Sequence, residues 1–183
     1  CTALLVNCRL VGAQIDWAIT GAFGDNLHGP AQKLAMKLGL SEEEVGYLES
    51  LGTYINYNGY GASLDDLHCH PGALYLALYQ CVTPMAFKYT ETYKRVSEGY
   101  AEDLFASSSV KPVLERSGFA IYQLPATAWA RRVSGVFSNK LVRDYPDRAH
   151  AVLTESVDGS FLVSVRAPMI RRRGALSVCQ QFE

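Results

Sequence analysis

Ala149-His-Ala-Val-Leu-Thr-Glu-Ser-Val-Asp-Gly-Ser-Phe-Leu-Val-Ser-Val-Arg166 is the stretch that decides the fold of this chain. Its two apolar, β-branched runs, 149–154 and 160–166, flank Asp158-Gly159, a pair typical of a tight hairpin turn. A third run of the same kind, 120–124, comes earlier in the chain. The three runs predict a small sheet, with a helix over 133–142 between the first two strands and a last helix over 175–182.

The first half of the chain has helical signals instead. Ser41 and Glu44 have the spacing of a capping box, and the helix that they open is expected to run to about Leu51. Gly24-Asp25-Asn26 predicts a turn that closes the apolar run 17–23. Further segments are a helix over 31–38, a loop over 53–63, a well-buried helix over 71–80, and an amphipathic stretch from Pro84 to about Ala106. The run 3–11 fits a helix or a buried strand equally.

Together these patterns predict an α/β fold with a mainly helical first part, a linker helix, and a small α+β domain with a mixed sheet. We expect the boundaries at 1–83, 84–109 and 110–183, because Ser107-Ser-Ser109 is the best linker candidate and the sequence texture changes after it.

Composition narrows the classes of function. The 183 residues carry a net charge of −1, which excludes a global basic field for long duplex DNA. No apolar run reaches the length of a membrane span, about 18 residues, so no membrane partner is expected. Five cysteines without a CxxC pair indicate reduced thiols in a cytoplasmic protein. Cys1 starts the chain without a signal-peptide pattern, and both ends are abrupt, so we expect a fragment of a longer protein.

Two motifs resemble those of the DHH phosphoesterases. Gly21-Ala-Phe-Gly-Asp25 is similar to the late motif of the family's first domain, whose aspartate binds metal. Ser164-Val-Arg166, followed by the segment 175–182, is similar to the Ser-x-Arg strand end and following helix of the DHH-associated domain. Trp17-Ala, Asn56-Tyr-Asn-Gly-Tyr-Gly61 and Arg132-Val-Ser-Gly135 extend the resemblance over the whole chain.

The resemblance implies the C-terminal part of a DHH domain over 1–83 and a DHH-associated substrate-binding domain over 110–183. The family's early Asp-x-Asp, middle aspartate and Asp-His-His motifs are absent from this chain, and it ends where the family's glycine-rich loop would begin. We therefore expect these parts to lie in the longer protein.

Asp25 is the candidate catalytic residue and the candidate metal ligand. The resemblance implies manganese or magnesium as cofactor, with two ions in the complete protein, and a carboxylate is a hard oxygen ligand that suits either metal. From the spacing alone, the better explanation of Gly24-Asp25-Asn26 is a turn in which Asp25 caps the next helix, and it is the resemblance that favours the metal ligand.

Arg166 is the candidate phosphate-binding residue, because its planar guanidinium grips phosphate oxygens with two hydrogen bonds. The alternative is a salt bridge or a solvent-facing position on the strand. Ser164 shares its face at period two and adds a hydroxyl. His150 is a further candidate if it faces the same cleft as Arg166, and a satisfied core or edge histidine is the more common alternative. The resemblance also implies that Ser134, Gly135 and Asn139 approach the ligand through backbone donors near a helix start.

Four more clusters of polar residues are weaker candidates for a functional site. Arg131-Arg132 and Arg171-Arg-Arg173 are short basic clusters, and the second could contact a nucleic-acid backbone, although we expect this triplet to be a solvated loop. His68-Cys-His70, with Asp65 and Asp66 nearby, invites a zinc site, but Asp65 or His68 capping the helix near Pro71 is the better explanation. The tyrosines and asparagines of 54–61 suit base stacking or a packed loop.

The function expected from the resemblance is manganese-dependent hydrolysis of phosphodiester bonds in short oligonucleotides or dinucleotides by the complete protein. The expected partner is an oligonucleotide or nucleotide substrate, and a homodimer stays open. A non-catalytic nucleotide-binding or nucleic-acid-binding module is the first competing interpretation. An enzyme of a different class, such as an acyltransferase, is the second, and a structural domain without a ligand is the third.

Overall fold

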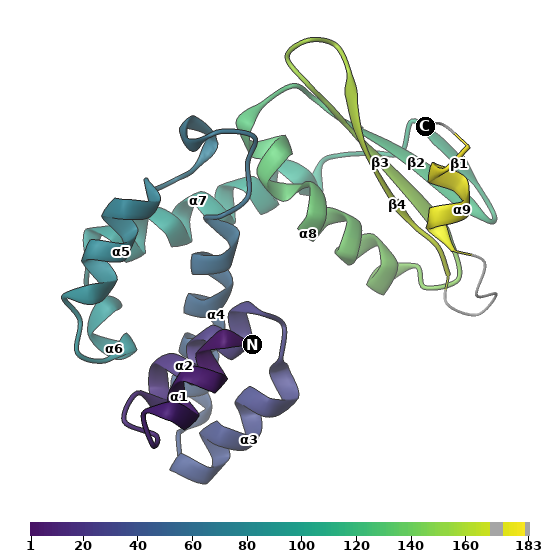
Figure 1. Ribbon diagram of the computed structural model, residues 1–183. Helices are drawn as coiled ribbons and strands as arrows, with labels where there is room; N and C mark the ends of the chain where they lie inside the picture. The colour runs from purple at the N-terminus through teal and green to yellow at the C-terminus, as the bar shows by residue number, and fades with distance from the viewer. Residues whose placement is uncertain (169–173, 182–183) are drawn as a thin grey trace. The chain divides into compact units, whose positions relative to one another are not determined.

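The computed structural model describes residues 1–168 and 174–181 and divides the chain into two compact units. The first unit contains Cys1–Tyr60 and Leu67–Ala101, and the second contains Gly61–Asp66 and Glu102–Glu183. The fold is α/β, with a helical unit and a unit built on a small mixed sheet, as the sequence predicts (Figure 1). None of the helices in the described ranges is long and apolar enough to cross a membrane.

The helical unit contains α1 to α6 and the first part of α7. The bounds are α1 Thr2–Arg9, α2 Ile15–Gly24, α3 His28–Leu38, α4 Glu42–Tyr57, α5 Pro71–Tyr79, α6 Pro84–Phe87 and α7 Glu91–Ser108. Its core is formed by side chains from α2, α3, α4 and the segments after α4, among them Ile19, Phe23, Leu48, Leu51 and Phe87.

Local signals set the ends of these helices. Ser41 and Glu44 make the predicted capping box, in which the Glu44 amide donates to the serine hydroxyl and the Ser41 amide donates to the Glu44 carboxylate. Gly39 ends α3 with φ 71°, a left-handed conformation that glycine adopts without strain. His70 caps α5 by accepting a hydrogen bond from Gly72 N to Nδ1 at 3.1 Å, so the expectation that Asp65 or His68 is the cap is wrong.

Two expectations for this unit fail for packing reasons. Helix α4 continues to Tyr57, well beyond Leu51, because Tyr57 is buried against Tyr100 with ring centroids 4.8 Å apart. Only Leu74 of α5 is buried, so this helix is not the well-buried one expected from its apolar sequence. The ambiguous run 3–11 is mainly helix α1.

The second unit is built on a four-stranded sheet in the order β1-β2-β3-β4. The bounds are β1 Leu114–Arg116, β2 Phe119–Leu124, β3 Ala149–Glu155 and β4 Phe161–Arg166, with the 3-10 helix η1 Leu64–Asp66 and helices α8 Ala128–Asp144 and α9 Ala175–Cys179. β2 and β3 are parallel, whereas β1 with β2 and β3 with β4 are antiparallel, so the sheet is mixed. The predicted Asp158-Gly159 turn joins β3 and β4, and Gly159 has φ 82°.

Helix α8 packs against β3 and β4 and covers one face of the sheet (Figure 1). That face carries alternate residues of the parallel pair, with Ala120, Tyr122 and Leu124 opposite His150, Val152 and Thr154. Val133 and Phe137 of α8 complete this core. Because Ser164 and Arg166 pair directly with Val152 and His150, they lie on the same covered face.

Candidate functional site

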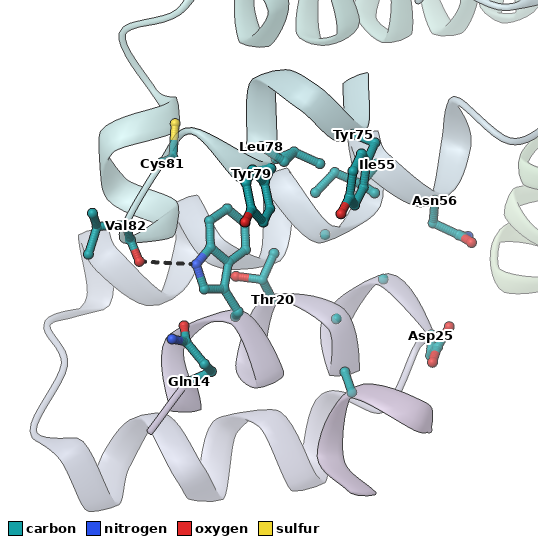
Figure 2. A pocket seen from close by; sticks show the side chains of 15 residues that line it. Gln14, Thr20, Asp25, Ile55, Asn56, Tyr75, Leu78, Tyr79, Cys81 and Val82 are labelled. Carbon is teal, nitrogen blue, oxygen red and sulfur yellow. Dashed lines mark hydrogen bonds between the residues drawn. The ribbon is translucent and has the colours of Figure 1, made fainter. Parts of the chain in front are cut away.

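A pocket of about 800 Å³ lies within the helical unit (Figure 2). Its walls combine aromatic side chains with a few polar groups. The lining residues discussed below are Trp17, Asp25, Asn56, Tyr75, Tyr79 and the glycines 21, 24 and 52. A concave and mainly apolar pocket with few polar groups is the usual form of a small-ligand site.

The floor of this pocket is the crossing of α2 and α4, where the two backbones touch. A Cβ atom on Gly52 would lie 2.2 Å from Thr20 O and 2.8 Å from Gly24 N. A Cβ atom on Gly24 would lie 2.8 Å from Gly52 O. These glycines are therefore required by close helix packing, and they leave bare backbone between the aromatic walls.

Asp25 follows α2 and lines one end of the pocket. Its backbone amide donates to Gly21 O at 3.1 Å, and Asn26 after it has φ 58°, so the predicted turn is present. The Asp25 side chain is exposed and has no hydrogen-bond or ion-pair partner in the described part of the chain. Figure 2 shows Asp25 and Asn56 on the same side of the pocket, away from Cys81 and Val82.

Asn56 is the residue of this site whose position sequence reasoning missed. The segment 53–63 was expected to be a loop, but α4 carries Asn56 to the pocket, where its Nδ2 donates to the Tyr60 hydroxyl at 3.1 Å. No local signal showed this, because Gly52 is typical of a helix end and α4 continues past it. Tyr54 and Tyr57 of the same segment are packed in an aromatic cluster with Tyr93 and Tyr100, which agrees with packing rather than base stacking.

The residues around Asp25 do not make up a set of metal ligands. Across 1–168 and 174–181, no group of three or more His, Cys, Asp or Glu side chains is placed to hold an ion. Asp25 contributes one hard oxygen ligand, and an ion of the manganese or magnesium type takes several. The His68-Cys-His70 segment makes no such group in the described residues either.

In the second unit, two of the predicted residues, Ser164 and Asn139, contact Arg166, and a third, Ser134, is linked to Ser164 through Ser138. Its Nη1 donates to Ser164 Oγ at 2.9 Å, and its Nε donates to Asn139 Oδ1 at 3.4 Å. The hydroxyls of Ser164 and Ser138 are 3.4 Å apart, and Ser138 Oγ donates to Ser134 O at 2.7 Å. These bonds form one chain from the guanidinium to the backbone of α8, which fixes the orientation of Arg166.

The charge of Arg166 is not neutralised by a carboxylate in the described residues. Its three acceptors are all neutral, namely the Ser164 hydroxyl, the Asn139 amide oxygen and Val165 O. Arg148, by contrast, is paired with Glu115. An oriented and uncompensated guanidinium attracts an anion more strongly than a paired one.

His150 lies directly beside Arg166 in the strand register, but its side chain is only 1% exposed. The ring Nε2 is 3.2 Å from Tyr145 O, and Nδ1 is buried without a partner. Burial lowers the pKa of His150, and the nearby Arg148 charge lowers it further, so the neutral ring is favoured. The structure thus places this candidate in the core beneath α8.

Ser134 and Gly135 do not offer backbone donors at a helix start. Helix α8 begins at Ala128, so their amides lie in its second turn, where helical hydrogen bonds use the N–H groups. Ser134 contributes its carbonyl to the Ser138 bond instead. A Cβ atom on Gly135 would meet nothing within 4 Å, so this glycine is not needed for a close approach.

The two arginines of the Arg131-Arg132 cluster are paired with acidic residues of the same unit. Arg131 Nε donates to Asp66 Oδ2 at 2.7 Å, while Arg132 Nε donates to Asp103 Oδ2 at 2.6 Å and its Nη1 donates to Asp66 O. The Arg131 ion pair and hydrogen bonds hold the pKa of the Asp66 carboxyl well below its usual range. The cluster Arg171-Arg-Arg173 lies outside the described residues.

Comparisons of this chain with models of known families, with curated proteins and with solved structures find no match. The resemblance to the DHH phosphoesterases therefore stays a prediction. The evidence for function comes from the pocket around Asp25 and the cluster around Arg166.

Proposed function

We propose that this chain is part of a DHH-type phosphoesterase that hydrolyses phosphodiester bonds of short oligonucleotides or dinucleotides. The observation that carries the proposal is the Arg166 cluster, where neutral acceptors orient a guanidinium without neutralising it. In this role Arg166 holds a substrate phosphate. The near-neutral net charge favours a short substrate over a long polymer, because a long polymer is attracted by an extended basic surface.

The chemistry of the cluster suits a phosphate. A guanidinium presents paired N–H groups to two phosphate oxygens, and its planar shape selects that geometry. The Ser164 hydroxyl is held beside it and is able to donate to the same anion. Asn139 on α8 contributes an amide whose NH₂ group is a further donor.

Asp25 is the proposed metal ligand of the complete protein, with manganese or magnesium as the ion. Such an ion polarises phosphate oxygens and activates water when it is bound. The described residues supply only one of its ligands, so we derive no step of the reaction through the metal. The role assigned to Asp25 itself is to present an unpaired carboxylate at the end of the pocket.

A non-catalytic nucleotide-binding module is the second candidate function. It is favoured by the fact that the Arg166 cluster is built entirely from α8 and β4 of the second unit. Phosphate binding there needs no residue from the pocket that Asp25 lines.

The test is to measure binding and manganese-dependent hydrolysis of a 5′-phosphorylated dinucleotide by the full-length protein. Arg166→Ala is expected to weaken binding by about 10-fold to 100-fold, the loss of a hydrogen bond to a charged group. Arg116→Ala is the matched control, because Arg116 is an exposed arginine on β1 that donates only to Glu115 O. Equal effects of the two substitutions would overturn phosphate binding by Arg166.

Hydrolysis separates the two candidate functions. If Asp25→Asn abolishes release of mononucleotide while dinucleotide binding persists, the phosphoesterase is supported. If the wild-type protein binds the dinucleotide and releases no mononucleotide with manganese or magnesium, the binding module replaces it.

A further inference from the structure

The pocket of the helical unit has an aromatic end that phosphate chemistry at Asp25 leaves unexplained. We propose that this end binds the ring of one nucleobase of the substrate by stacking. The inference deepens the proposed function and rests on it for the identity of the substrate. The residues that carry it are Trp17, Tyr75 and Tyr79.

Two tyrosines form one wall of this end. Tyr75 and Tyr79 lie one turn apart on α5, with ring centroids 5.9 Å apart and ring planes at 25°. Their residues are 62% and 77% exposed, although both line a concave pocket (Figure 2). Large aromatic rings left accessible in a pocket mark a surface that a ligand covers, because covering them removes apolar area from water.

Trp17 is held in one orientation. Its indole Nε1 donates to Val82 O at 3.3 Å, a bond between α2 and the segment after α5. A ring fixed in this way loses little entropy when a second ring stacks on it. The bare glycine backbone between α2 and α4 leaves room beside it for a flat ligand.

Asp25 and Asn56 lie toward the other end of the pocket, whereas Gln14 lies on the side of Val82. Trp17 and Asp25 are eight residues apart on and just after α2, which places them about 12 Å apart along the helix. That span is comparable to the reach from a nucleobase to its phosphate. A base at Trp17 and Tyr79 would therefore direct the sugar and phosphate toward Asp25 and Asn56.

A nucleobase fits this end better than an extended peptide that pairs as a β-strand. The described part of the helical unit contains no strand, so it offers no sheet edge to which an extended peptide could add. Every base has a flat π-face, and stacking on aromatic side chains contributes about 1–3 kcal/mol per base without strict sequence preference. The Asn56 amide supplies both a donor group and an acceptor atom for polar parts of such a ligand.

The experiment titrates adenosine, which carries a base and no phosphate, into the 1–183 chain with the Trp129→Phe substitution. Trp17 and Trp129 are the two tryptophans of the chain, so the remaining fluorescence change reports on Trp17. Tyr79→Ala is expected to weaken adenosine binding by about 10-fold, whereas Tyr79→Phe keeps the ring and is expected to change it less than about twofold. Tyr89→Ala is the matched control, since Tyr89 is 88% exposed and does not line the pocket.

Three outcomes would overturn the inference: no adenosine response in the parent protein, equal losses in the Tyr79→Ala and Tyr89→Ala variants, or phenol binding as tightly as adenosine. Arg166→Ala is expected to leave adenosine binding unchanged, because adenosine has no phosphate. If the protein binds the dinucleotide through Arg166 but does not bind adenosine, the base site is refuted and the proposed function stands. If adenosine binding depends on Tyr79 but the protein neither binds nor cleaves the dinucleotide, the base site stands and the proposed function is refuted.

Discussion

Gly52→Ala is expected to destabilise the helical unit, although alanine is the better helix former. At an interior helical position the change from glycine to alanine normally stabilises by about 1 kcal/mol. Here the new Cβ atom would lie 2.2 Å from Thr20 O and 2.8 Å from Gly24 N, both backbone atoms of α2. The two helices must move apart to accept it.

The magnitude follows from these opposing effects. Overpacking a well-packed contact costs about 1–3 kcal/mol, and the upper end applies because backbone atoms cannot rotate away as a side chain does. Subtracting the helix propensity gain leaves a net loss of about 2 kcal/mol in the free energy of unfolding.

Gly46→Ala on the same helix is the matched control. A Cβ atom on Gly46 would meet nothing within 4 Å, so this substitution is expected to stabilise the unit by about 1 kcal/mol. The assay is urea unfolding followed by Trp17 fluorescence in the Trp129→Phe protein. The difference between the two variants is expected to be about 3 kcal/mol, and equal unfolding midpoints would refute the close contact between α2 and α4.

Two further predictions concern local electrostatics and capping. Ser41→Ala removes the capping box of α4 and is expected to lower the free energy of unfolding by about 1 kcal/mol, measured in the same urea assay. Ser50→Ala, in the interior of the same helix, removes no cap and is not expected to lower it. The lowered pKa of Asp66 means that its ionised form is stabilised by folding. That contribution is present above the carboxyl's ordinary pKa, about 3.9, and is lost as the pH falls through the lower folded value. Asp66→Asn should therefore lower the free energy of unfolding at pH 7 by about 2 kcal/mol and make this free energy less dependent on pH below neutrality. The measurement is unfolding followed by Trp129 fluorescence in a Trp17→Phe protein. An unchanged acid dependence would contradict the ion pair of Asp66 with Arg131.

Short-range signals were sufficient for most of the secondary structure. The capping box at Ser41, the left-handed Gly39 and the Asp158-Gly159 turn each act within a few residues, so their effects are visible in the sequence. The length of α4 was not visible in this way, because burial of Tyr57 against Tyr100, 43 residues later, extends the helix. Strand β1 was missed because its three residues are exposed and too few to show a periodic pattern.

In the candidate site, too, the features set by neighbouring residues were predictable from the sequence, and those set by tertiary packing were not. Ser164 and Arg166 are two residues apart on a strand, so their shared face was predictable from period two, and the structure places them in contact. Asn56 and Asp25 come to one pocket through the packing of α4 on α2, which no local pattern encodes. The pairing of Arg131 and Arg132 with Asp66 and Asp103 also depends on tertiary structure, and basic residues without such partners would be solvated.

Because Gly61–Asp66 belong to the sheet unit, the two units are difficult to produce as separate polypeptides. These six residues are separated in sequence from the rest of their unit by Leu67–Ala101, so no single cut yields both units intact. A recombinant 102–183 polypeptide would lack Asp66, leaving Arg131 without its carboxylate and Arg132 without the Asp66 carbonyl. Adding a synthetic peptide of residues 61–66, or joining it to the fragment through a short linker, would restore both acceptors, so the isolated unit is expected to be more stable with this hexapeptide than without it.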